Sequence, residues 1–151
     1  MIEHLIYACV LVLIQAWVLP AAFNTKNMQW MLSNRDANPD TTLYYDRSKK
    51  AFANLQESIP VFFLLGLLGV ITSTDLSYLM MYWLIFRVIH VFSYVAGIAL
   101  LRSLSFIASV VVLFMMAGAL ISARLLTQLK LVCINCLVVF FYMPNMMFIN
   151  K

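Results

Sequence analysis

The chain has 151 residues, of which 64% are hydrophobic and 11% are charged, and its mean hydropathy is +0.94. Soluble domains carry about 25% charged residues, so this composition predicts an integral membrane protein and excludes disorder or a disulfide scaffold. The net charge of +4 comes from ten basic and six acidic residues without a basic stripe, so no nucleic-acid partner is expected. The apolar residues form long blocks rather than alternating short segments, which predicts an all-α protein.

Four apolar blocks predict four membrane-spanning helices. The first, over residues 5–23, has about 19 residues, and at about 1.5 Å per residue it nearly spans a hydrocarbon core of about 30 Å. The second is expected to begin near Arg47 with Thr42 or Asp46 as its cap, and to run to Ile71. The third and fourth are predicted over residues 76–101 and 105–126. Their short connections predict an antiparallel four-helix bundle.

Two segments lie outside these blocks. Residues 24–57 are polar and contain a dense set of turn formers at 33–40, which predicts one substantial loop leading into the second helix. After a polar break at 127–130, residues 131–149 are apolar again and leave three alternatives open: a fifth spanning helix, an interfacial helix or a frayed end. We therefore divide the chain into a membrane domain, 1–130, and a C-terminal extension of unknown role, 131–151.

Basic residues gather at one end of the predicted bundle. The loop before the second helix and its first turns carry five of them: Lys26, Arg35, Arg47, Lys49 and Lys50. Arg102 follows the third helix, whereas the N-terminus and the connection after the second helix have none. The positive-inside rule then predicts an outside N-terminus and a cytoplasmic loop over residues 24–57. Arg124 and Lys130, at the far end of the fourth helix, run against this distribution.

Charged residues inside the predicted third helix need an explanation, since an Arg near a helix centre costs about 2.5–3.5 kcal/mol on insertion scales. Arg87, His90 and Tyr94 follow the spacing i, i+3, i+7 and therefore share one helical face. This face is expected to point inward.

The start of the second helix carries a matching polar stripe, formed by Arg47, Lys50, Asn54 and Glu57. We expect the two polar faces to meet, with Glu57 as the partner of Arg87. Two interpretations are open. The two residues form a structural ion pair, or the excess of cations forms a pocket for an anion that also bears an amine.

Two sequence blocks resemble a known family. Residues 47–60, RSKKAFANLQESIP, resemble the second-helix signature of the MAPEG family, the membrane-associated proteins in eicosanoid and glutathione metabolism. Residues 87–97, RVIHVFSYVAG, followed by Leu101, Arg102 and Ser103, are similar to its third helix and the turn after it. The resemblance covers about residues 5–127 and is nearest to small bacterial members, which implies a bacterial inner membrane.

The resemblance implies a homotrimer of four-helix protomers that holds glutathione between neighbouring subunits, near the cytoplasmic face. Asn54 and Glu57 match the positions that hold the γ-glutamyl end. Lys50 and Arg87 match those that bind the carboxylates. The implied activity is a glutathione transferase or peroxidase that acts on lipophilic small molecules arriving from the bilayer.

Three residues are implied to serve the chemistry. Arg102 and Ser103 match the place where the family's transferases stabilise the glutathione thiolate. Tyr94 lines the same pocket with His90 and is a second hydroxyl candidate near sulfur. A guanidinium suits this role independently, because it lowers the pKa of a thiol from its usual value of about 8.5.

Other interpretations stay open. Ala53 stands where the best-studied transferases have a second basic residue, which predicts weaker binding of the tripeptide. A non-catalytic lipid-binding or scaffold protein of the same fold is therefore the alternative. Cys133 and Cys136 form a CxxC spacing, but they lack a histidine or a second pair nearby, so no metal site is expected.

Overall fold

The structure, a computed structural model, describes residues 1–34 and 40–146, with side chains up to Cys133. Its elements are α1 (Ile2–Leu13), η1 (Ile14–Val18), α2 (Leu19–Phe23), η2 (Thr25–Asn27), α3 (Met28–Leu32), α4 (Leu43–Ile71), α5 (Ser77–Ala96) and α6 (Ala99–Met146). Four helical stretches are long and apolar enough to cross a membrane: Ile2–Phe23, Leu43–Ile71, Ser77–Ala96 and Ala99–Cys133. The predicted all-α membrane bundle is confirmed.

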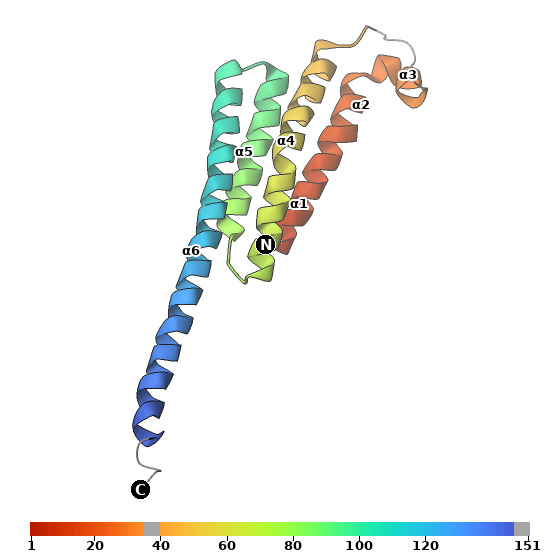
Figure 1. Ribbon diagram of the computed structural model, residues 1–151. Coiled ribbons are helices and arrows are strands. Elements are labelled where there is room, and N and C mark those ends of the chain that lie inside the picture. The colour runs from red at the N-terminus through yellow and green to blue at the C-terminus, as the bar shows by residue number, and fades with distance from the viewer. Residues whose placement is uncertain (35–39, 147–151) are drawn as a thin grey trace.

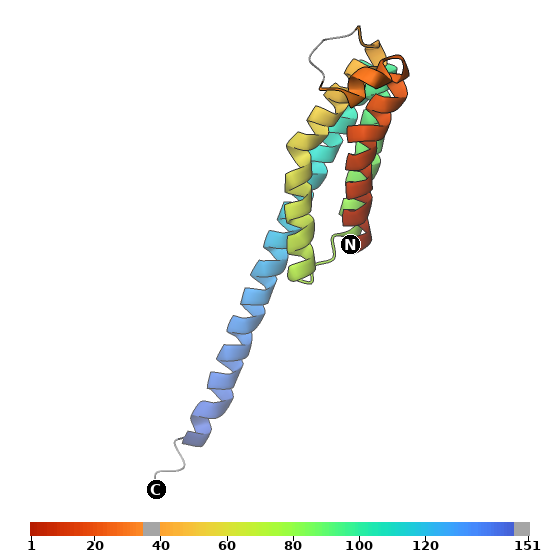
Figure 2. The ribbon, with the colours of Figure 1, turned by 90° about the vertical axis from the view of Figure 1, so that its right-hand side faces the viewer.

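The four stretches run alternately up and down (Figure 1). One end of the bundle, called the N-terminal end here, holds Met1 and the connection 72–76 between α4 and α5. The other, called the loop end, holds α3 and the turn between α5 and α6. Figures 1 and 2 show α6 continuing far past the N-terminal end. Its 48 residues make a rod of about 72 Å, more than twice a hydrocarbon core of about 30 Å.

The first spanning stretch is helical throughout, but its middle, η1, is a π-helix. The N–H of Leu19 bonds the carbonyl of Ile14, five residues earlier. Pro20 gives the physical reason, because it has no N–H for the carbonyl of Ala16 and the wider spacing removes the need for that bond. The same segment turns Gln15 inward, where only 2% of its surface is exposed.

The second spanning helix begins earlier than predicted. α4 starts at Leu43 rather than near Arg47, because the Thr42 side-chain oxygen accepts the N–H of Tyr45 at 3.2 Å. The hydroxyl of Thr42 also donates to the carbonyl of Phe23 at 2.6 Å, which ties the start of α4 to the end of α2. Thr42, one of the two predicted caps, is therefore the observed one.

The third spanning helix ends earlier than predicted. α5 stops at Ala96 rather than 101, since Gly97 has a φ of 81° and leaves the right-handed helical region. The N–H of Gly97 bonds the carbonyl of Tyr94 at 3.2 Å, and that of Ile98 bonds Ser93 at 2.9 Å. Consequently Arg102 lies in the first turn of α6 and not in a connecting loop.

The predicted break at residues 127–130 is absent. The hydroxyl of Thr127 donates to the carbonyl of Ala123 at 2.9 Å, and the backbone stays helical to Met146. Leu129 and Lys130 are good helix formers, which explains why this polar stretch does not end the helix. The apolar tail up to Met146 therefore continues the fourth helix instead of forming a fifth; residues 147–151 lie outside the described part.

The core joins all four spanning helices. Its fully buried members are Ala8, Leu55, Phe62, Leu76, Met80, Trp83, Val112, Leu113 and Met116. The rings of Phe62 and Trp83 stack across α4 and α5 with their centroids 4.0 Å apart. Gly66 lets α1 and α5 approach α4, since a Cβ there would lie 2.8 Å from Leu5 and 2.9 Å from Met80. Tight packing near these rings thus fixes α5 against α4.

Gly97→Ala is expected to destabilise the folded protomer by about 1–2 kcal/mol, the usual cost of a left-handed residue with a side chain. Its Cβ would also lie 2.7 Å from a guanidinium nitrogen of Arg47, which donates to the carbonyl of Val95 at 3.2 Å. Gly118→Ala is the matched control, because a Cβ there meets nothing within 4 Å. Replacing a glycine inside a helix by alanine raises the free energy of unfolding by about 0.5–1 kcal/mol. The unfolding temperature in detergent should fall for Gly97→Ala and rise for Gly118→Ala. A shift of the same sign in both variants would contradict the role given to Gly97.

Candidate functional site

Polar side chains from α4, α5 and α6 meet at the loop end of the bundle. They border a cavity of about 350 Å³. Its lining residues are Asn54, His90, Tyr94, Arg102, Ser103, Phe106 and Ile107. We call this the loop-end cavity. The structure thus brings together five of the residues that the sequence singled out.

Arg87 lies behind this cavity and is almost completely buried, with 1% of its surface exposed. Its Nη1 donates to the carbonyl of Asn54 at 3.4 Å. The guanidinium lies 5.4 Å from the ring centroid of Trp83 and 5.2 Å from that of Phe106, close enough for cation–π attraction. Its Nε and Nη2 are buried without a hydrogen-bond partner. The inward orientation predicted for this face is confirmed, and the buried cation still has donors to offer.

The predicted contact between Glu57 and Arg87 is wrong. Within the described residues, no ion pair shorter than 4.0 Å joins them, and Glu57 is exposed. The buried side of α4 follows Ala51, Leu55 and Ser58, and Glu57 lies about 100° round the helix from Ser58, so its side chain is exposed. The backbone carbonyl of Asn54 accepts the hydrogen bond from Arg87 instead. Lys50 is exposed on α4 as well. Glu57 therefore acts on the buried Arg87 only through a longer-range charge attraction and not through a direct ion pair. Neither Lys50 nor Glu57 lines the loop-end cavity.

His90 connects α5 to the first turn of α6. Its Nδ1 lies 3.1 Å from the carbonyl oxygen of Arg102. A carbonyl oxygen only accepts, so this bond assigns the proton to Nδ1 and leaves Nε2 of the neutral ring as an acceptor. Nε2 is buried and has no partner. His90 thus presents a hydrogen-bond acceptor beside the donors of Arg87 and Arg102.

Arg102 is half-buried at the edge of the cavity, with its guanidinium 5.0 Å from the ring centroid of Tyr94. Tyr94 in turn meets His90 edge to face, with centroids 5.6 Å apart. The hydroxyl of Ser103 donates to the carbonyl of Ala99 at 3.0 Å. Arg102 and Tyr94 are therefore better placed than Ser103 to donate to a ligand in the cavity.

Phe106 and Ile107 also line the cavity, and neither was predicted from the sequence. Phe106 packs against His90 with ring centroids 5.8 Å apart. A signal was present: Phe106 follows Arg102 by four residues, so the two share a face once α6 is known to begin at Ala99.

The sequence model of the MAPEG family matches residues 4–122, which is most of the chain. This chain belongs to the MAPEG family. No curated protein matches it. Membership supports a multi-pass membrane protein related to glutathione or eicosanoid metabolism. The family match ends within α6 at Ser122, so the first turns of that helix, with the residues of the loop-end cavity, belong to the MAPEG part and its long tail lies beyond it.

Proposed function

We propose that this MAPEG protein binds glutathione in the loop-end cavity and uses its thiolate against lipophilic electrophiles, as a glutathione S-transferase or peroxidase. One observation carries the proposal. Arg87 is 1% exposed, and two of its buried nitrogens, Nε and Nη2, have no hydrogen-bond partner. Burying a guanidinium with unpaired N–H groups costs folding free energy unless an anion binds to those groups. The carboxylates of a tripeptide have the required charge and geometry.

The charge balance of the site supports a ligand with more than one carboxylate. Arg102 is the charged residue that lines the cavity, and Arg87 lies directly behind it. Lys50 and Glu57 project from the outer face of α4. In the homotrimer that we propose, a neighbouring subunit covers this face, so Glu57 would meet the ligand's ammonium group and Lys50 a carboxylate at the subunit boundary.

The proposed chemistry needs few groups. A thiol with a pKa of about 8.5 is mostly protonated at pH 7, and the Arg102 guanidinium stabilises its ionised form. In the transferase reaction the sulfur attacks an electrophilic carbon, a carbon–sulfur bond forms, the bond from that carbon to the leaving group breaks, and the proton released from the thiol neutralises the leaving group. In the peroxidase reaction the sulfur attacks a peroxide oxygen and the O–O bond breaks to release an alcohol, and a second glutathione then converts the sulfenic acid to the disulfide and water. Ile107, 57% exposed at the edge of the cavity, offers an apolar approach from the bilayer. Orientation and charge stabilisation supply the rate increase.

A non-catalytic lipid-binding or scaffold protein is the second candidate. The hydroxyl of Ser103 donates to the backbone of its own helix, and two of the eight predicted site residues project outward. Both observations favour a pocket that is less complete than a transferase requires.

Calorimetric titration of the detergent-purified protein with glutathione separates the two candidates. Binding heat with a stoichiometry near one per subunit or one per trimer supports the transferase. Absence of heat at millimolar ligand supports the scaffold. Lys130→Gln, an exposed substitution on the distal part of α6, is the matched control and should titrate like the wild type.

We further propose a bacterial inner-membrane location with the N-terminal end outside and the loop end in the cytoplasm, as the loop charges indicate. In a variant without Cys9, Cys133 and Cys136, Ser73→Cys should react with an impermeant thiol reagent in intact cells. Asn34→Cys should react only after the membrane is opened. The reverse labelling pattern would overturn the proposed orientation.

A further inference from the structure

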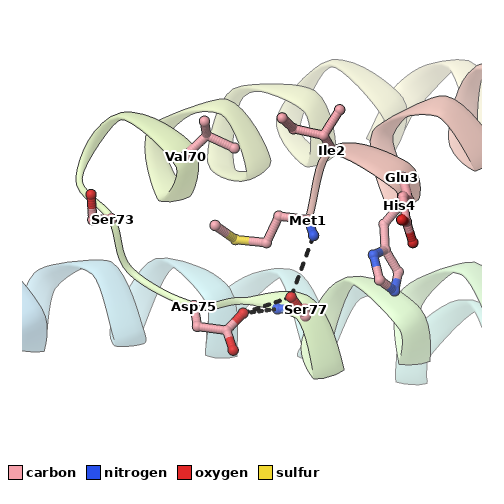
Figure 3. A pocket seen from close by; sticks show the side chains of 8 residues that line it. All are labelled: Met1, Ile2, Glu3, His4, Val70, Ser73, Asp75 and Ser77. Atoms are coloured by element: carbon pink, nitrogen blue, oxygen red, sulfur yellow. Dashed lines mark hydrogen bonds between the residues drawn. The ribbon is translucent and has the colours of Figure 1, made fainter.

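The connection between α4 and α5 has a cavity on each side at the N-terminal end of the bundle. The first, shown in Figure 3, holds the carboxylates of Glu3 and Asp75. Asp75 accepts the hydroxyl and the N–H of Ser77 at 2.6 and 3.0 Å, which holds its pKa below the usual range. The N-terminal amine of Met1 donates to the same hydroxyl at 3.4 Å. The Asp75 carboxylate is thus already bound within the chain.

The second cavity, about 260 Å³, lies between the connection and α6. Its lining residues are Thr72, Thr74, Leu120, Ala123, Arg124, Thr127 and Gln128. Arg124 is the one charged residue among them, so this cavity is positive where the first is negative. Its volume is below the roughly 300–1,000 Å³ of pockets for drug-sized ligands and suits a compact anionic group.

Hydrogen-bond donors remain available in this cavity. The hydroxyls of Thr72 and Thr127 donate to the carbonyls of Leu68 and Ala123 at 2.8 and 2.9 Å. By contrast, within the part of the chain that the structure describes, the Arg124 guanidinium and the Gln128 amide have no hydrogen-bond or ion-pair partner. A guanidinium fork beside an amide is a suitable receptor for phosphate oxygens.

We infer that this second cavity binds the phosphate of a membrane phospholipid. It lies where the apolar stretch of α4 ends at Ile71 and the polar connection to α5 begins, and such a change from apolar to polar residues is expected where headgroups meet the hydrocarbon core. Exposed apolar side chains flank it on both helices for the acyl chains: Ile71 at the end of α4 is 69% exposed, and Ile121, which precedes Arg124 on α6, is 62% exposed. Headgroup and chains therefore find polar and apolar surfaces in the order that a phospholipid presents them.

A bound phosphate also gives a reason for the position of Arg124. Arg124 lies at the end of the bundle where the loop-charge rule expects few cations. A phosphate-bearing headgroup stabilises a basic side chain at this level through direct attraction. Lys130 lies six residues further along α6, about 9 Å beyond Arg124, and does not line the cavity.

Native mass spectrometry of the detergent-purified protein, titrated with phosphatidylglycerol, tests the inference. Arg124→Gln is expected to weaken lipid retention by about tenfold, the loss of one charge-assisted contact. Lys130→Gln removes the same charge from the same helix and should retain the lipid. Equal retention in wild type and Arg124→Gln, or equal losses in both variants, would overturn the inference, because no specific site would then distinguish the two cations.

Two further arms identify the recognised group. Diacylglycerol, which has the chains without the phosphate, should not displace bound phosphatidylglycerol, and displacement by it at equal concentration would overturn the phosphate contact. Inorganic phosphate should displace the lipid only at far higher concentration, since it lacks the chains. Displacement by phosphate at the lipid's own concentration would instead show a free-anion site. Arg124 is exposed, and far-ultraviolet circular dichroism of both variants should match the wild type.

Discussion

Arg87→Met is expected to weaken glutathione binding by about ten- to a hundredfold, since hydrogen bonds to a charged group contribute about 1.5–3 kcal/mol and 1.4 kcal/mol is tenfold. The folded protomer should be as stable as the wild type or more so. Arg87 has no ion-pair partner within 4.0 Å among the described residues, and its Nε and Nη2 are buried without hydrogen bonds, so an apolar side chain of similar length removes a desolvation cost that is only partly offset by the Asn54 carbonyl and the neighbouring rings. The substitution should therefore lower the affinity for glutathione without lowering the stability of the ligand-free protomer.

Two measurements decide this prediction together: calorimetric affinity for glutathione and thermal unfolding in detergent without ligand. Arg87→Lys is the matched control, because it keeps the charge but loses the planar fork, and it should bind with intermediate affinity. If Arg87→Met unfolds at a lower temperature and its folded fraction binds glutathione unchanged, then Arg87 serves the bundle and not the ligand.

Arg102→Leu is expected to reduce the rate of conjugation by about a hundredfold, comparable to the loss of one donor from an oxyanion hole. Its effect on affinity should be smaller, because the guanidinium acts on the sulfur rather than on the ligand's carboxylates. The pKa of the bound thiol should rise, so the ultraviolet absorbance of the thiolate should fall at pH 7 in the saturated protein. Arg102→Lys should keep part of this absorbance through its point charge.

Lys50→Leu is the counterpart, since Lys50 lies on the outer face of α4 and away from the loop-end cavity. It should weaken glutathione binding without changing the pKa of the bound thiol. Equal thiolate absorbance in wild type and Arg102→Leu, both saturated with glutathione, would remove Arg102 from the mechanism. Tyr94 would then be the preferred donor, because the Ser103 hydroxyl already donates to Ala99.

The fold was predictable because each spanning helix is an apolar block long enough to cross a bilayer. The inward face of α5 was predictable for a related reason: a 3.6-residue repeat places Arg87, His90 and Tyr94 on one side, and the membrane forbids that side to face lipid. Two of these residues, Arg87 and His90, are buried almost completely, at 1% and 3% exposure.

The contact of Arg87 was not predictable, because periodicity fixes the face of one helix and says nothing of the rotation of its neighbour. α4 presents the carbonyl of Asn54 where a carboxylate was expected. Helix ends were missed for a different reason. Apolar blocks continue through Gly97, and only its left-handed backbone ends α5. The break predicted at residues 127–130 was wrong for a similar reason, because composition alone does not show whether the backbone leaves the helical conformation; α6 continues there.

The length of α6 makes the chain modular in a way that matters for its evolution and engineering. The last fully buried core residue on this helix is Met116, and partly buried contacts continue only to Leu120. A chain that stops after Lys130 would keep every described core residue and both cavities that α6 borders. The side chains described beyond that point, those of Leu131, Val132 and Cys133, are exposed, so a chain shortened at Lys130 is expected to keep the packing of the bundle and to accept a fused domain there.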